Sequence, residues 1–264
     1  MDAGGANLVA LSTADGLVLV DSGPFQSAGQ VTAGLRNVAA DANVGTLFNT
    51  HYHADQTGNN EMFAASGARI IAHDLTRQWM STDYWVPVED RFATARPEAA
   101  RPTETFQTNG SLDAGVEAID YGYLQLAHTS GDMYVFFKTS NVIAVGDVAS
   151  PLLDPVLDYY TGGWIGGRVD AMDLVLGLGN EQTRIVPAYG RVMTRAEFRA
   201  ERDLMEEVRD RLFTQVREGK GPEDMLEAGL LDGLPRSWND PDKFLHDAAK
   251  GMWAHHNKLD RNVV

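Results

Sequence analysis

Two histidines and a carboxylate lie within five residues of one another in this chain: His51, His53 and Asp55. They follow directly on an apolar run at 44–48, which predicts a short strand. Where a strand leads into a loop, side chains at positions i and i+2 can turn toward one point. Two imidazoles placed in this way can fill two positions of a tetrahedral zinc ion, at about 2.0–2.1 Å each. Taken alone, the pattern fits a polar loop with two unrelated histidines equally well.

Two further residues of ligand type also follow predicted strands. His128 comes after an apolar run at 123–127, and Asp147 comes after another at 141–146. A single histidine in such a place is more often a packing residue with a hydrogen bond. Three histidines and an aspartate, each at the carboxyl end of a predicted strand, instead indicate a converging cluster. The sequence therefore predicts a metal site made of His51, His53, His128 and Asp147.

The motifs around these residues resemble those of the metallo-β-lactamase superfamily. Residues 49–60, Asn-Thr-His-Tyr-His-Ala-Asp-Gln-Thr-Gly-Asn-Asn, resemble its signature loop, whose usual form is Thr-His-x-His-x-Asp-His-x-Gly. Four more motifs stand in the family's order: Val20-Asp21-Ser22-Gly23, His128-Thr129-Ser130-Gly131-Asp132, Gly146-Asp147 and Val186-Pro187-Ala188-Tyr189-Gly190. The resemblance spans residues 20–190. It implies an α+β fold, the four-layer αββα sandwich, with the site at the edge where the strand-end loops meet.

Two positions depart from the family pattern. Gln56 stands where the family has the histidine after Asp55, and Tyr189 stands where it has the last histidine. In the family both histidines bind the second metal, together with the equivalents of Asp55 and Asp147. A glutamine oxygen and a phenol with an unperturbed pKa of about 10 are poor zinc ligands. The resemblance therefore implies a degenerate second site beside a complete first site of His51, His53 and His128.

We expect a mononuclear zinc hydrolase that cleaves an ester, lactone, amide or related bond by a metal-activated water. In this hypothesis Asp55 is the general base, and Tyr189 donates a hydrogen bond to the developing oxyanion. Asp147 orients the site or adds a carboxylate ligand. Two alternatives stay open. One is a catalytically degenerate binding protein of the same fold, and the other is a mono-iron oxidoreductase that uses His51, His128 and Asp147.

Aromatic and glycine-rich segments near the predicted site are candidates for a substrate pocket. Residues 81–105 hold three of the ten prolines, which predicts a long loop or lid with one short helix. A second loop at 159–167 follows Asp147 and is rich in glycine and aromatic residues. We expect the pocket wall to include Gln56, Trp85, Tyr160 and Trp164.

The rest of the chain is expected to belong to the same single domain, 1–264. A capping box at Thr194 and Glu197 predicts the start of a helix and of a mostly helical C-terminal part, 194–264. The turn at Asp21 comes early, so the first sheet is expected to be short at its edge. A strand from a second copy could complete that edge in a homodimer.

The composition excludes several other kinds of protein. With 22 basic and 37 acidic residues the net charge is −15, which should repel nucleic acids and anionic lipids. The lack of cysteine excludes disulfides, thiolate zinc sites and cysteine nucleophiles. No serine lies in a triad context, and no window approaches the roughly 20 apolar residues of a membrane span. The expected partner is a small-molecule substrate.

The compartment stays open in the sequence. No signal peptide is visible after Met1. The resemblance is strongest to secreted or periplasmic bacterial hydrolases, which implies an exported protein.

Overall fold

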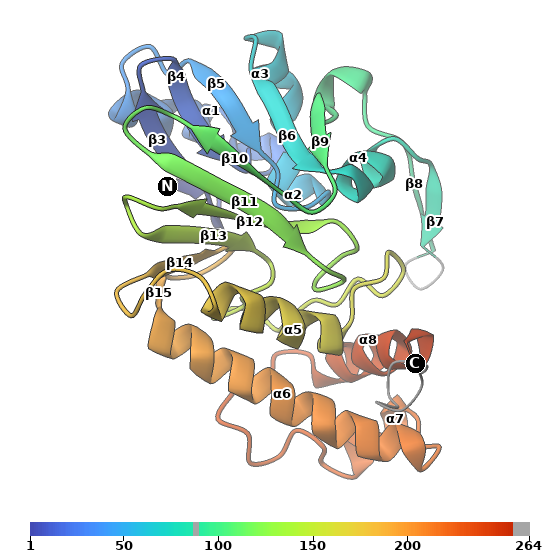
Figure 1. The fold of residues 1–264 in the computed structure, drawn as a ribbon. Helices are drawn as coiled ribbons and strands as arrows, with labels where there is room; N and C mark the ends of the chain where they lie inside the picture. The colour runs from blue at the N-terminus through green and yellow to red at the C-terminus, as the bar shows by residue number, and fades with distance from the viewer. Residues whose placement is uncertain (87–89, 256–264) are drawn as a thin grey trace.

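Two β-sheets packed face to face form the centre of the computed structural model, which describes residues 1–86 and 90–255 (Figure 1). The first sheet has five strands in the order β3 (Val9–Thr13), β4 (Gly16–Val20), β5 (Val44–Phe48), β6 (Arg69–His73) and β9 (Glu104–Phe106). The second has six in the order β10 (Asn109–Asp113), β11 (Ala118–Leu124), β12 (Asp132–Phe137), β13 (Val142–Gly146), β14 (Arg184–Pro187) and β15 (Met193–Thr194).

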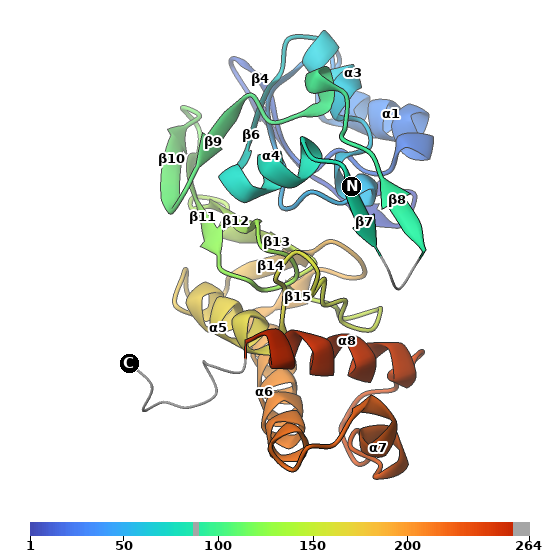
Figure 2. The same cartoon turned by 90° about the vertical axis from the view of Figure 1, so that its right-hand side faces the viewer.

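Helices cover the outer face of each sheet. α1 (Ala28–Val38), α3 (Asn60–Ala65) and α4 (Asp74–Met80) lie on the first sheet, whereas α5 (Ile165–Leu176), α6 (Arg195–Arg217) and α8 (Pro241–Ala254) lie on the second. Figure 2 shows the layers in succession from α1 and α3 to α5 and α6. The expected αββα sandwich is therefore confirmed. In the described part of the chain, no helix has the length and apolar character needed to cross a membrane.

Strand β4 shows why this sequence forms a buried layer. Side chains alternate between the two faces of a strand. Leu17 and Leu19 pack toward α1, in the core between the first sheet and its helices. Val18 and Val20 pack against the second sheet, in the core between the two sheets. A strand that is covered on both faces is apolar along its length, as β4 is.

The segment 81–105 is more ordered than expected. It holds a β-hairpin of β7 (Tyr84–Val86) and β8 (Arg91–Ala93), a single 3-10 turn η3 (Glu98–Ala100) and the beginning of β9. Residues 87–89 lie outside the described part. The prediction of a long loop with one short helix was wrong about the hairpin, because strands of three residues are too short to show a period in the sequence.

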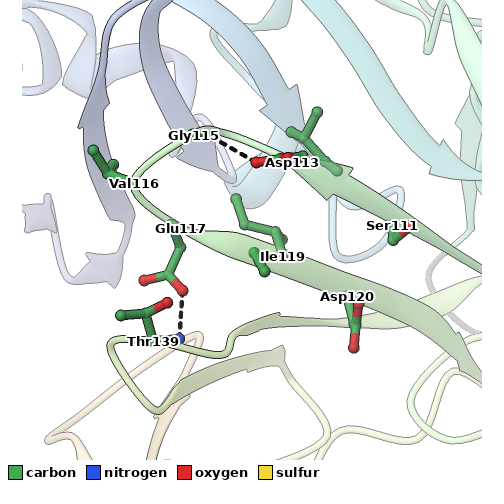
Figure 3. Close-up of a pocket in the computed structure, with 10 residues that line it drawn as sticks. Ser111, Asp113, Gly115, Val116, Glu117, Ile119, Asp120 and Thr139 are labelled. Atoms are coloured by element: carbon green, nitrogen blue, oxygen red, sulfur yellow. Dashed lines mark hydrogen bonds between the residues drawn. The ribbon is translucent and has the colours of Figure 1, made fainter.

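The start of the second sheet also differs from the prediction. A strand was expected at 123–127, whereas β11 runs over Ala118–Leu124 and is preceded by β10, which ends at Asp113. Residues 114–117 form the turn between them, which Figure 3 shows. Gly115 has a φ of +75°, and its N–H donates to the Asp113 carboxylate at 2.8 Å. The Asp-x-Gly turn, with its local hydrogen bond, therefore separates β10 from β11.

The C-terminal part begins as expected. The Thr194 side chain accepts from the Glu197 N–H, and the Glu197 carboxylate accepts in return from the Thr194 backbone, so the predicted capping box is present at the start of α6. After α6 the chain continues through α7 (Pro222–Glu227) to α8, which packs on α5 and α6.

Candidate metal centre

The four predicted ligand residues lie at one edge of the sandwich, at the carboxyl ends of strands. His51 and His53 follow β5 and precede α2 (Ala54–Thr57), His128 lies between β11 and β12, and Asp147 follows β13. A hydrogen bond from the Met133 N–H to the Thr50 carbonyl, at 2.9 Å, links the two sheets at this point. The link brings the end of β5 to the start of β12, although the two strands belong to different sheets.

The three histidines converge. One ring nitrogen of each of His51, His53 and His128 lies within 4.8 Å of the others. The closest approach is 3.0 Å, between His53 Nδ1 and His128 Nε2. His51 and His128 are buried, and His53 is partly exposed toward the pocket described below. This spacing is that of imidazoles arranged around one small cation.

Hydrogen bonds on the far side of two rings fix which nitrogen is free. His128 Nδ1 lies 2.8 Å from the Val156 carbonyl and must donate to it, so Nε2 carries the lone pair. Thr50 Oγ1 donates to Asp21 Oδ2 at 2.7 Å and therefore accepts from His51 Nδ1 at 3.2 Å. His51 Nε2 is then a buried acceptor without a hydrogen-bond partner among the described residues. A buried acceptor of this kind is expected where a cation binds.

His53 is oriented by a residue that the sequence did not indicate. Its Nε2 lies 3.3 Å from Asp158 Oδ2, which also accepts from the Tyr52 hydroxyl at 2.5 Å. Because Nε2–H donates to this carboxylate, Nδ1 is the ring nitrogen of His53 that is turned toward His128 Nε2, 3.0 Å away. A carboxylate behind a ligating imidazole is a common partner in metal sites. Asp158 is a single aspartate in an irregular loop, and neither its spacing nor its neighbours could have identified it.

The electrostatics of the cluster favour neutral imidazoles at His51 and His128. Burial, and then the neighbouring histidines, lower the pKa of His51 well below its ordinary value, and burial also lowers the pKa of His128. Burial opposes protonation of His53 too, but the hydrogen bond and charge of Asp158 raise its pKa. Burial, followed by the charge of Asp55, raises the pKa of Asp147 to about 7. Neutral imidazoles are the form that binds metals.

Asp147 lies against the histidines as predicted. Its Oδ2 is 3.5 Å from His51 Nε2 and 3.8 Å from His128 Nε2. The carboxylate therefore faces the two buried nitrogen atoms that carry lone pairs. It is placed to complete a ligand set with His51, His53 and His128, or with His51 and His128 alone.

Two of the residues at the positions of the family's second metal site, Tyr189 and Asp55, are hydrogen-bonded to each other in this protein. The Tyr189 hydroxyl donates to Asp55 Oδ2 at 2.5 Å. Burial, and then the bond to Asp55, raise the pKa of the Tyr189 phenol, so it remains a neutral donor. Gln56 is fully buried, and its amide nitrogen and oxygen have no hydrogen-bond partner within the described residues.

A pocket of about 290 Å³ opens onto this cluster. Apolar side chains and carboxylates share its wall, which is lined by His53, Asp55, His128, Asp147, Ala149, Ser150, Leu153, Asp154, Val156 and Tyr189. The expected active-site residues Asp55 and Tyr189 thus border the same pocket as two of the histidines.

The four residues expected in the pocket wall are not among those that line it. Gln56 is buried within α2, and Trp85 is half-exposed on the β7–β8 hairpin. Tyr160 stacks on Tyr159, with ring centroids 4.3 Å apart. Trp164 is buried and stacks on His255, which follows α8, at 4.8 Å. Gly163 and Gly167, on either side of Trp164, pack closely against the backbone of residues 126–128.

A second hollow of about 390 Å³ lies at the other end of β11 (Figure 3). Its most buried ionisable group, Glu117, is already used. The carboxylate accepts from the Thr139 and Ser140 backbone and from the Ser140 hydroxyl. This hollow therefore belongs to a braced turn and is not a candidate active site.

Comparison with known proteins agrees with the geometry. A family model described as the metallo-beta-lactamase superfamily matches residues 1–207. No match was found among curated protein sequences. Among solved structures, a metallo-beta-lactamase from Pontibacter korlensis is 17% identical with a TM-score of 0.62, covering 76% of this chain and 87% of its own.

A sulfatase extends the structural likeness further along the chain. The stereoselective inverting sec-alkylsulfatase Pisa1 from Pseudomonas sp. has a TM-score of 0.67 at 11% identity. The match covers 95% of this chain and 47% of the sulfatase, so this chain spans about half of that protein. At such identities the likeness concerns the fold alone. With the family model matching most of its length, the chain belongs to the metallo-β-lactamase superfamily.

Proposed function

We propose that this protein is a mononuclear zinc hydrolase that cleaves an ester, lactone, amide or related bond. The observation that carries the proposal is the convergence of one ring nitrogen from each of His51, His53 and His128 within 4.8 Å of one another, with His51 Nε2 buried and without a hydrogen-bond partner among the described residues. A donor set of three neutral imidazoles is the one that catalytic zinc sites use.

The residues around the cluster have separate roles. When bound, zinc supplies Lewis acidity and water with a pKa near 7. Asp55 borders the pocket and accepts the proton of the attacking water. Tyr189 holds Asp55 Oδ2, which leaves the other carboxylate oxygen for that proton. In this structure the Tyr189 hydroxyl therefore donates its hydrogen bond to Asp55. The hydroxyl can donate to a developing oxyanion only if the substrate displaces the Tyr189–Asp55 hydrogen bond.

The pocket wall supports a substrate with an apolar part. Ala149, Leu153 and Val156 are apolar residues that line the pocket. All three come from the loop between β13 and α5. An acyl or alkyl group of a substrate would pack on these side chains while its scissile bond faces His53 and His128.

Elemental analysis of the protein purified without added metal or chelator, followed by zinc titration, tests the proposal. We expect about one tightly bound zinc per chain. His51→Ala should abolish binding, because it removes one of three ligands. Tyr189→Phe should leave binding unchanged and lower turnover roughly tenfold to a hundredfold, the effect of losing a hydrogen bond to a charged group. Equal loss of metal in both variants would contradict the ligand assignment.

The same measurement separates the two alternatives. About one iron per chain would favour the oxidoreductase, and the distances from Asp147 to His51 and His128 support that ligand set as a second candidate. Failure to bind zinc or iron would mean that the histidine cluster is structural, and the hydrolase proposal would be abandoned in favour of a binding protein.

A further inference from the structure

A fully buried arginine lies directly behind the loop that carries Asp147. Arg168, in the first turn of α5, has an exposed fraction of 0%. Its Nη1 donates to the Asp147 carbonyl at 2.8 Å, and its Nη2 donates to Ser150 Oγ at 2.8 Å. The Arg168 guanidinium therefore donates hydrogen bonds to both ends of the segment 147–150.

A buried glutamate on α6, Glu201, accepts a hydrogen bond from the same segment. Glu201 Oε1 accepts from the Ser150 N–H at 2.6 Å and lies 3.6 Å from Arg168 Nη2. The two side chains come from neighbouring helices and meet only at this loop. Both ends of the segment that follows β13 are thus fixed by charged groups from α5 and α6.

The pair is poorly explained by stability alone. Arg168 Nε and Glu201 Oε2 are buried and have no hydrogen-bond partner within the described residues. A buried ion pair with unsatisfied atoms contributes little net stability, because desolvation of both charges offsets their attraction. An apolar pair of similar volume would fill the same space without this cost.

The beginning of α5 also touches the segment that carries His128. A Cβ on Gly163 would lie 2.0 Å from the His128 carbonyl oxygen, and one on Gly167 would lie 2.1 Å from that of Leu126. Only glycine allows this approach. The segment that leads into α5 therefore contacts the backbone of His128, and Arg168 of that helix contacts the backbone of Asp147, so both of these candidate ligands are packed against it.

We propose that Arg168 and Glu201 are positioning residues of the metal centre. They hold the backbone of 147–150 so that the Asp147 carboxylate stays against His51 Nε2 and His128 Nε2. The inference rests on the proposed function in one respect, namely that a metal binds at the histidine cluster.

The test compares Arg168 with a partly buried arginine of the same helix pair. Arg195, at the start of α6, donates to the Leu178 carbonyl at 2.6 Å and to that of Leu176, at the opposite end of α5 from Arg168. Arg195→Met thus removes comparable bonds without touching the loop of Asp147. The readouts are zinc affinity, by competition with a chelator, and the visible absorption spectrum of the Co²⁺-loaded protein.

We expect Arg168→Met to weaken zinc binding roughly tenfold to a hundredfold, as for other groups that orient metal ligands. The Co²⁺ bands should change in position and intensity, because the coordination sphere changes. Arg195→Met should lower the Tm and leave both readouts as in the wild type. Should Arg168→Met fail to fold, Glu201→Gln, which keeps an acceptor for the Ser150 N–H, should shift both readouts in the same direction by a smaller amount.

Three outcomes would overturn the inference or its basis. Wild-type affinity and spectrum in a folded Arg168→Met or Glu201→Gln protein would remove the positioning role. Equal weakening in Arg195→Met would reduce it to general stability. A wild-type protein that binds neither Zn²⁺ nor Co²⁺ would instead refute the proposed function itself.

Discussion

Each of the three candidate histidine ligands makes a hydrogen bond with the ring nitrogen that points away from the cluster. Three ordinary hydrogen bonds, to Thr50 Oγ1, Asp158 and the Val156 carbonyl, decide which nitrogen of each histidine is free. The second site differs in that Tyr189 gives a proton to Asp55 where a histidine would offer a lone pair. In the proposed mononuclear site, the absence of a second metal therefore depends on two side chains, Gln56 and Tyr189, and replacing them should create a second site.

Replacing both of these side chains should restore a second metal site. Gln56→His with Tyr189→His supplies two imidazoles beside Asp55 and Asp147, and imidazole nitrogen suits zinc far better than amide or phenol oxygen. We expect zinc titration followed by calorimetry to give about two equivalents in the double variant, against about one in the wild type.

The single variants are the controls for this experiment. Gln56→His alone leaves the Tyr189–Asp55 hydrogen bond in place, and Tyr189→His alone leaves Gln56 buried without partners. Each should bind a second zinc weakly. A double variant that saturates at one equivalent would show that the backbone around Asp55 has closed on the site.

At the residue scale, the sequence predicted the candidate ligands but not the residues that hold them in place. Each candidate ligand follows an apolar run, and this position at a strand end predicted His51, His53, His128 and Asp147. Asp158 and Arg168 act through contacts with residues 105 and 21 positions away, respectively. No local pattern encodes such contacts, because they arise from the packing of loops on helices.

Among the elements, the turn between β12 and β13 shows how a single carboxylate joins two hairpins. Glu117 precedes β11, yet its carboxylate accepts from the Thr139 N–H at 2.5 Å, the Ser140 N–H at 3.0 Å and the Ser140 hydroxyl at 2.7 Å (Figure 3). Although burial acts against it, these bonds hold the pKa of Glu117 below its ordinary 4.5.

Glu117→Gln should therefore destabilise the protein in a pH-dependent way. We expect a loss of about 2 kcal/mol near neutral pH, as for hydrogen bonds to a charged group. A carboxylate whose pKa is lowered on folding stabilises the protein above its unfolded pKa, and this contribution disappears as the pH falls through the folded pKa. Urea unfolding at neutral pH and again below 4.5 should show the gap between variant and wild type narrowing.

Asp120→Asn, three residues further along the chain on β11, is the matched control. Asp120 is 41% exposed and pairs with Lys138 at 3.0 Å, an ion pair on the surface. Such pairs contribute about 0–1 kcal/mol, so this variant should stay close to the wild type. A gap for Glu117→Gln that is constant with pH would mean that the carboxylate does not carry the effect.

The elements that line the pocket were the hardest to predict. Strands β5 and β13 were evident as apolar runs, because the sandwich buries both faces of a central strand. The loop between β13 and α5 is irregular, and the C-terminal part fixes it. Arg236 donates to the Ser150 carbonyl at 2.9 Å, and the Asn239 N–H donates to Asp154 Oδ2 at 2.9 Å. These contacts join residues more than 80 positions apart in the chain, so no local sequence pattern predicts them.

On the scale of the whole molecule, charge is the property that bears most on the substrate. The chain carries a net charge of −15, and the pocket wall itself holds the carboxylates Asp55, Asp147 and Asp154. Among its described lining residues there is no lysine or arginine. A field of one sign that is focused in a cleft repels ligands of the same sign. A single bound zinc would offset only part of this charge.

Neutral esters should therefore be better substrates than anionic ones of the same size. 4-Nitrophenyl hexanoate and the mono-4-nitrophenyl ester of adipic acid have acyl chains of equal length, and only the second ends in a carboxylate. At low ionic strength we expect kcat/KM to be roughly tenfold higher for the neutral ester, because the anion is repelled during approach. Added salt should narrow the difference, since the Debye length falls to about 8 Å at 0.15 M. If the anionic ester were preferred, and salt weakened that preference, a cationic group would have to reach the pocket, and the acidic wall would not select the substrate.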